Sequence, residues 1–331
     1  MGSIFTPFFI HEGASGDSSC GSLLADLGTR RISPAHLYNS PVLSSLWHRV
    51  HLAHSPLRQS PKKGSCEYSR FAQSMLPLVS GKKVTVTSLG CGDGYKDALF
   101  LKTWQKAASS ISYQPVDISA HLVKKACDSC SKLSRVQIMP GVCGNLADQQ
   151  FIQDISHLQK DKSLKIGFYF GINPNFQQVD FFNLLKKSFL HFDHVVFSAN
   201  LAPGDDYEKG VRKIFTQYDN PETRDWFLEF LGSLGIRAQK KALEFSIRKF
   251  LRPLPHYAIC VNYIFPEKTA LSLYGQRVSF KKGESLDIFH SFRHTLQTLK
   301  GFSLLSQLTI TREQVSPDQQ EALLSVQKKS A

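Results

Sequence analysis

The sequence contains no uninterrupted apolar run of roughly 18 residues, the length that a membrane-spanning helix needs. Its first residues, MGSIFTPFFIHEG, also lack the basic segment with which a secretory signal peptide begins. We therefore expect a cytoplasmic protein without a membrane span. Gly2 and Thr6 do fit the short N-myristoylation pattern, but a pattern of this length arises easily by chance.

A paired metal-binding motif is also missing. The seven cysteines are scattered and odd in number, which favours reduced thiols over a disulfide framework. Cys127 and Cys130 form one CxxC in a helical stretch, but zinc would need two more ligands at close spacing and none follows. His290 and His294 are spaced as neighbours on an expected final helix, and we interpret them as surface or core histidines. No metal is expected.

Acidic residues are the minority charge, since 27 Asp and Glu stand against 40 Lys and Arg, for a net charge of +13. A basic surplus of this size raises the hypothesis of nucleic-acid binding. However, the basic residues form scattered doublets, such as Lys62-Lys63 and Lys186-Lys187, rather than a cluster with interleaved aromatic residues. We expect a solvated basic surface on a monomer, and we do not expect nucleic acid to be the main partner.

The 331 residues do contain an alternation of strand-like and helix-like segments, in a chain long enough for one large or two modest domains. Strands are expected at residues 84–89, 111–118, 136–142, 165–172 and 194–201, with amphipathic helices between them. This order is typical of right-handed βαβ units and a parallel sheet. The predicted fold class is α/β, with a doubly wound sheet.

The rest of the chain predicts an insertion and a helical N-terminal region. Residues 55–66, rich in Pro, Ser and Lys, predict a loop or linker. Residues 205–247 predict mainly helices, and residues 257–265 and 276–280 predict antiparallel strands. A helix and a strand are expected to close the chain. We expect the helices that precede the sheet to pack against the insertion.

A glycine-rich turn follows the first strand of the predicted sheet. Gly90, Gly92 and Gly94 lie in SLGCGDGYKD, between a strand and a helix, where glycines let the backbone approach a ligand. No Gly-Lys-Ser/Thr closes a P-loop, and Tyr95 occupies the last glycine position of G-x-G-x-x-G. The turn therefore favours a nucleotide-like ligand without identifying it.

Two polar residues follow the next strands. Asp117 ends the second strand, where an acid accepts hydrogen bonds from ribose hydroxyls, although it could instead cap the following helix. Asn145, farther along, could contact an adenine edge or hold a turn. Dinucleotides and S-adenosylmethionine both use such elements, and the residues alone leave both possible.

Six segments in order resemble the histidine-specific S-adenosylmethionine-dependent methyltransferase family, which includes the L-histidine Nα-methyltransferases of ergothioneine biosynthesis. The similarity runs from about residue 22 to 325. The segments are LLADLGTRRISPAHLY, SLGCGDGYKD, PVDIS, FGINPNF, FTQYDN and VSFKKGESLDIFHSFRHT. The resemblance implies a Rossmann-like class I methyltransferase sheet with a second, smaller substrate-binding domain, and S-adenosyl-L-methionine as the cofactor.

The resemblance also implies a role for each matching residue. Tyr38 and Tyr218 would act in catalysis. The substrate would be bound by Asn175, Tyr218, Phe289 and Ser291, with Arg293 on a family lysine. The cofactor would be bound by Gly90, Gly92, Gly94, Lys96, Asp117 and Asn145. Without the resemblance, Asn175 and Tyr218 would be interpreted as turn residues beside Pro174 and Asp219-Asn220-Pro221.

Departures from the family pattern concern the substrate. Phe289 stands where histidine-binding members have a glutamate, and the family tyrosine near positions 54 to 55 is missing from HSPLR. Ile172 and Pro174 replace Thr and Gly, and Asn145 replaces a usual Asp. An imidazole beside phenylalanine would leave ring nitrogens unpaired, whereas an apolar or aromatic side chain could pack there. We hypothesise that the amino-acid clamp is kept and the side-chain pocket is altered.

The predicted domains are a cofactor-binding domain of residues 72–203 and 291–331, a substrate-binding domain of residues 20–71 and 204–290, and an N-terminal extension of residues 1–19. The predicted function is N-methylation of a small amino acid or derivative. Two alternatives remain: a non-catalytic S-adenosylmethionine-binding protein, and a methyltransferase that acts on a macromolecule.

Overall fold

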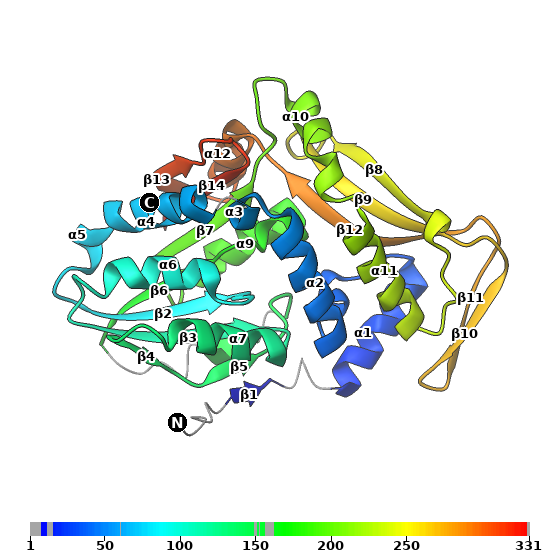
Figure 1. Cartoon of the computed structure of the whole chain (residues 1–331), viewed down its shortest axis with the longest axis horizontal. Helices are drawn as coiled ribbons and strands as arrows, with labels where there is room; N and C mark the ends of the chain where they lie inside the picture. The colour runs from blue at the N-terminus through cyan, green and yellow to red at the C-terminus, as the bar shows by residue number, and fades with distance from the viewer. Residues whose placement is uncertain are drawn as a thin grey trace.

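The computed structural model describes residues 8–11, 16–59, 61–148, 151, 153–155 and 162–329. Gly2 and Thr6 lie outside these residues. Figure 1 shows a large sheet with its helices on the left and smaller sheets with helices on the right. Helix α2 (Pro41–His54) lies between the two parts. None of the helices in the described ranges is long and apolar enough to cross a membrane.

Within the described residues the large sheet has nine strands, and its central strands are parallel. Its order is β1 (Phe8–Ile10), β5 (Gly141–Cys143), β3 (Ser110–Asp117), β2 (Lys83–Leu89), β6 (Leu164–Tyr169), β7 (His194–Asn200), β14 (Glu321–Lys328) and β13 (Leu308–Val315), and β4 (Val136–Ile138) also pairs with β3. The chain runs outward from β2 to β3 and β5, then returns to β6 on the other side of β2. The predicted doubly wound sheet is confirmed, and its switch point lies between β2 and β6.

Helices cover both faces of this sheet, which is why its central strands are buried along nearly their whole length. One face is covered by α4 (Pro61–Ser74), α6 (Tyr95–Trp104) and α7 (Ala120–Cys130), and the other by α9 (Gln178–Ser188) and α12 (Leu296–Leu305). Phe100, Trp104 and Phe168 fill the first core, and Phe182 and Phe302 stack in the second. All five expected strands are confirmed, the third as the two short strands β4 and β5.

The second part is built on the antiparallel sheet β12–β9–β8 and the hairpin β10–β11. The strands are β8 (Leu243–Phe250), β9 (His256–Ile264), β10 (Thr269–Leu273), β11 (Gln276–Phe280) and β12 (Ser285–Arg293). Helices α1 (Gly16–Thr29), α2 and α11 (Pro221–Ser233) share one core with these strands. The N-terminal helices therefore pack against the insertion, as predicted. Short elements complete this part: α10 (Tyr207–Lys213), η2 (Pro34–Leu37), η4 (Phe215–Gln217) and η5 (Lys240–Ala242), whereas α5 (Leu76–Val79) packs in the core of the large sheet.

Three local predictions are wrong. The described residues of segment 55–66 form α3 (Pro56–Gln59) and the start of α4 rather than a loop, because Pro56 and Pro61 stand at first helical positions, where a missing N–H costs nothing. Residues 243–247, the end of the segment predicted to be mainly helical, instead belong to β8. His290 and His294 are not on a final helix: His290 lies within β12 and His294 follows it. The alternating aromatic residues of this segment suit a strand paired with β9.

The end of β12 is joined to the large sheet by backbone hydrogen bonds. The His294 N–H donates to the Asn200 carbonyl at 3.0 Å, and the Ala202 N–H donates to the His294 carbonyl at 2.8 Å. The Tyr207 hydroxyl also donates a hydrogen bond to the Arg293 carbonyl at 2.5 Å. The last residues of β12 are thus held where β7 ends, so they face the same edge as the glycine turn.

We expect Gly94→Ala to destabilise the protein more than Gly81→Ala. Both glycines have left-handed backbones, with φ of +71° and +70°, so each alanine costs about 1–2 kcal/mol. A Cβ at Gly94 would also lie 2.6 Å from the Cα of Ala126 in α7, whereas nothing lies within 4 Å of one at Gly81. Urea denaturation of both variants measures the difference, and equal losses would mean that α6 and α7 do not need this close approach.

Candidate active site

A cavity of about 930 Å³ lies between the two parts of the molecule. Its walls come from the residues that follow β2, β3, β5, β6 and β7 on one side, and from η2, α2, α11 and β12 on the other. Among the predicted site residues all except Gly94 line it, namely Tyr38, Gly90, Gly92, Lys96, Asp117, Asn145, Asn175, Tyr218, Phe289 and Ser291. Gly94 instead lies behind the turn, at the start of α6.

The glycine turn is held against the neighbouring strand. The N–H groups of Gly90 and Cys91 both donate to the Val116 carbonyl, at 2.8 and 2.9 Å. Gly90 has a φ of +75°, and a Cβ there would lie 2.2 Å from Cγ2 of Ile172 in the loop after β6. Glycine is therefore required where the turn passes the switch point.

Asp117 links this turn to the end of β3. Its carboxylate accepts the Gly92 N–H at 3.0 Å and the Ser119 N–H at 3.1 Å. The N-cap of α7 is Ser119, whose hydroxyl accepts the Leu122 N–H, so Asp117 is not the cap. The side chain is only 7% exposed, and this burial raises the pKa of Asp117 to about 6.

Asn145 and Lys96 line the cavity on either side of that region. The Asn145 side-chain oxygen accepts the Ala147 N–H at 3.0 Å, so Asn145 holds a turn as well as lining the cavity. Lys96 lies 2.6 Å from a Glu321 carboxylate oxygen, to which the Tyr68 hydroxyl also donates at 2.7 Å. The Lys96 charge is thus already paired.

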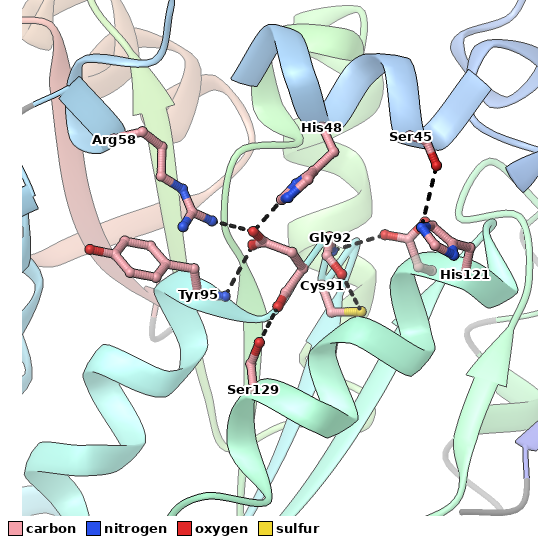
Figure 2. A network of polar contacts seen from close by, with 10 residues as sticks. Ser45, His48, Arg58, Cys91, Gly92, Tyr95, His121 and Ser129 are labelled. Atoms are coloured by element: carbon pink, nitrogen blue, oxygen red, sulfur yellow. Dashed lines mark hydrogen bonds and ion pairs between the residues drawn. The ribbon is translucent and has the colours of Figure 1, made fainter. Parts of the chain in front are cut away.

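Asp93, in the middle of the glycine turn, connects the turn to the α2–α3 segment. Arg58 of α3 forms an ion pair with its carboxylate and lies 3.7 Å from the Tyr95 ring centre. His48 of α2 lies 3.6 Å from the same carboxylate. In Figure 2, Arg58 and His48 reach from this segment toward the turn, and Ser129 of α7 supports it from below with a hydrogen bond to the Asp93 carbonyl at 2.8 Å. These contacts close one side of the cavity.

Two hydrogen-bonded pairs of polar side chains also line the cavity. The Asn175 amide, in η3 (Asn173–Asn175), donates to the Tyr38 hydroxyl at 3.3 Å. The Tyr218 hydroxyl lies 2.8 Å from the Ser291 hydroxyl, and the Arg293 guanidinium donates to it. Desolvation raises the pKa of Tyr38 above its usual range, so Tyr38 keeps its proton at neutral pH.

An aromatic wall joins these two pairs. The Trp226 ring centre lies 5.4 Å from that of Tyr38 and 6.0 Å from that of Phe289, which in turn lies 6.4 Å from Tyr218. Trp226 is fixed because its indole N–H donates to the Leu37 carbonyl at 3.1 Å. The wall is therefore apolar in its middle and polar at both ends.

His51 adds an imidazole to the cavity without adding charge. It stacks on Trp47, with ring centres 5.2 Å apart. Burial is the main cause that lowers the pKa of His51 to about 3, and the nearby Lys96 and Arg58 act in the same direction. The ring is neutral at physiological pH.

The cysteine pair and the two histidines singled out in the sequence are buried. Cys127 and Cys130 are buried unpaired thiols on α7, as predicted. His290 and His294 are buried in the second part, and burial lowers their pKa values to about 4 and about 3. Across the described ranges, no group of three or more His, Cys, Asp or Glu side chains could hold a metal ion.

Sequence reasoning missed Trp47, Arg58, Asp93 and Trp226. Arg58 belongs to HSPLR, where the family comparison concerns only a missing tyrosine and the composition predicts a loop. Asp93 lies inside the glycine motif, where the sequence analysis gives binding roles only to the glycines and Lys96. The two tryptophans lie at helical spacing in α2 and α11, where an aromatic residue usually packs in a core.

Comparisons with known proteins identify a family. A family model described as histidine-specific methyltransferase, SAM-dependent, matches residues 67–328. The solved CcbJ methyltransferase from Streptomyces caelestis is 9% identical, over 80% of this chain and 90% of that chain, with a TM-score of 0.40. The mitomycin 7-O-methyltransferase MmcR is 10% identical, over 96% of this chain and 69% of that chain, with a TM-score of 0.42. No curated protein matches the sequence significantly.

We expect Asp93→Ala to loosen the α2–α3 segment. The change leaves Arg58 without its carboxylate partner, and losing a hydrogen bond to a charged group costs about 1.5–3 kcal/mol. Hydrogen–deuterium exchange should rise in residues 41–59 more than elsewhere. Glu284→Ala, which breaks the Arg30–Glu284 pair, is the control, and a similar rise in residues 41–59 there would refute a specific role for Asp93.

Proposed function

The chain belongs to the family of histidine-specific, SAM-dependent methyltransferases, and we propose that it methylates the amine of a small amino acid or amino-acid derivative. One observation carries this proposal. The glycine turn and Asp117 line the same cavity as two hydrogen-bonded pairs, Tyr38–Asn175 and Tyr218–Ser291. A cofactor and an amino acid can therefore share one enclosed space.

The residues on the sheet side fit S-adenosyl-L-methionine. The Asp117 carboxylate suits the ribose hydroxyls, and the turn at Gly90 and Gly92 leaves room for close backbone approach. Leu122 and Leu146 offer apolar surface to the adenine. When bound, this cofactor supplies an electrophilic methyl group on a sulfonium. Neutral His51 and the paired Lys96 avoid placing a free positive charge beside it.

Tyr38 and Asn175 are proposed to hold the acceptor amine. Tyr38 keeps its phenolic proton, so it orients the amine through its hydroxyl rather than removing a proton as a phenolate. Its hydrogen bond from Asn175 fixes the direction of that hydroxyl. An amino-acid amine is mostly protonated at neutral pH, and its proton must leave before transfer. Holding the neutral amine in line, away from water, then supplies much of the rate.

The aromatic wall is proposed to bind the acceptor's side chain. Phe289 and Trp226 offer packing and ring contacts, worth about 0.5–1.5 kcal/mol for an aromatic pair. No charged group stands at Phe289 to pair with an imidazole, so we propose an apolar or aromatic side chain rather than histidine. Tyr218 and Ser291 would bind the other polar group of the amino acid.

The proposal also covers the oligomeric state, the compartment and the roles of the two parts of the chain. We propose a monomer in the cytoplasm, with residues 72–203 and 291–331 binding the cofactor and residues 20–71 and 204–290 binding the acceptor. The cysteines whose side chains are described are unpaired, which suits a reducing compartment. The position of the site in a cavity between both parts favours a small acceptor over a macromolecule.

The proposal is tested with methyl-labelled S-adenosylmethionine and a panel of free amino acids, with transfer measured by mass spectrometry. We expect label on an amino acid with an apolar or aromatic side chain. Greatest transfer to histidine would refute the specificity drawn from Phe289. Cofactor binding without transfer to any member would instead support the non-catalytic alternative.

Affinity for S-adenosylhomocysteine should rise about tenfold between pH 5 and pH 7, because the ionised fraction of a group with a pKa of about 6 rises by that factor. Only ionised Asp117 accepts two hydroxyl hydrogen bonds. The effect on folding has the opposite sign, because a carboxyl whose pKa is raised from 3.8 binds more protons when folded, so its contribution to stability falls as pH rises through this range.

Two matched variants check this pH dependence by calorimetry. Asp117→Asn should remove it. Asp97→Asn should keep it, because Asp97 is also buried with a pKa raised to about 6 but does not line the cavity. Loss of the pH dependence in Asp97→Asn but not in Asp117→Asn would show that it arises from Asp97 and would refute the assignment to Asp117.

A further inference from the structure

The Arg293 guanidinium is buried without an acidic partner. The residue is 5% exposed, yet no carboxylate of the described chain lies within 4 Å of it. Its hydrogen bonds go to two neutral oxygens, the Leu201 carbonyl at 3.4 Å and the Tyr218 hydroxyl. Its Nε–H has no acceptor. A buried cation in this condition is unfavourable unless an anion joins it.

Other partly buried arginines of the chain differ in this respect. Arg30 pairs with Glu284, Arg58 with Asp93, and Arg224 with Asp219. Arg224 resembles Arg293 closely, because its guanidinium also lies over an aromatic ring, 4.6 Å from the Phe245 centre against 5.1 Å from the Tyr218 centre. The missing carboxylate is therefore particular to Arg293, which lines the cavity.

The strand that carries Arg293 aims it at the acceptor side. Phe289, Ser291 and Arg293 alternate along β12 and so point to one face, and all three line the cavity. Glu321 and Asp318 line the cavity too, but Glu321 is engaged by Lys96 and Tyr68. The cation thus stands beside Tyr218 and Ser291, at the far end of the aromatic wall from Tyr38.

We propose that Arg293 binds the carboxylate of the methyl acceptor and is its counter-ion in the cavity. The planar guanidinium matches a carboxylate, and Arg293 lines the cavity without an acidic partner of its own. This rests on the proposed function, and it makes a free carboxylate part of the acceptor's chemical class. Decarboxylated amines and carboxamides are then poor acceptors even when their side chains fit.

Acetate is a probe that tests this without knowledge of the acceptor's side chain. We expect the thermal midpoint of the full-length protein to rise with sodium acetate at constant ionic strength, and not with the neutral isostere acetamide. Arg293→Met should abolish the acetate shift, and Arg293→Lys should keep part of it. Arg224→Met is the matched control and should respond as the native chain does. The proposal is overturned if acetate raises the thermal midpoint of the native protein no more than that of Arg293→Met. It is also overturned if acetate raises the midpoint of the native protein no more than acetamide does.

A second measurement separates the two sources of a carboxylate. S-adenosylhomocysteine carries its own carboxylate, and its affinity should be unchanged in Arg293→Met, which also confirms that the variant is folded. A loss of about 30-fold or more, as expected when a buried charge pair is broken, would assign Arg293 to the cofactor and overturn the acceptor assignment. Failure of the native protein to bind S-adenosylhomocysteine would refute the proposed function, while the acetate result would still decide whether Arg293 binds a carboxylate.

Discussion

The edge at which the parallel strands end is the constraint on which the rest of this structure depends. The parallel strands of a doubly wound sheet all end at the same edge. The strand order reverses between β2 and β6, and this reversal opens a crevice at that edge. The glycine turn, Asp117 and η3 follow three of these strand ends. The second part of the molecule covers this edge and supplies the other wall of the cavity from η2, α2, α11 and β12.

Much of the fold and site could be predicted because the signals are local. The apolar strands, the helices between them and the SLGCGDG turn each lie within one short segment, and their order along the chain implies the sheet. The ordered motifs also assign Tyr38, Asn175 and Ser291 to one predicted site, although these residues lie far apart in the sequence. The structure brings these residues to one cavity, but it leaves their chemical roles as proposals.

The errors and omissions depend on contacts that local patterns do not contain. Pro56 and Pro61 suggested a loop, whereas each begins a helix that packs on the sheet side. The sequence around His290 predicts a helix, and only its pairing with β9 in the folded protein makes it a strand. Arg58 and Asp93 meet across 35 residues of chain, and Trp226 reaches Tyr38 across a much longer separation. Only a tertiary structure can reveal such pairs.

Several ionisable groups that line the cavity carry no unpaired charge. Lys96 is paired with Glu321, His51 is neutral, and Tyr38 retains its proton. Two charged groups of the proposed sites, Asp117 and Arg293, lie on the sheet side and on β12 respectively. The junction of β12 with β7 consists of backbone hydrogen bonds, whereas the opposite side is closed by the side chains around Asp93. The β7–β12 side of the cavity is therefore fixed by main-chain pairing, whereas the α2–α3 side depends on side-chain contacts that can break and re-form while every strand stays paired, so we expect any opening of the cavity on the α2–α3 side.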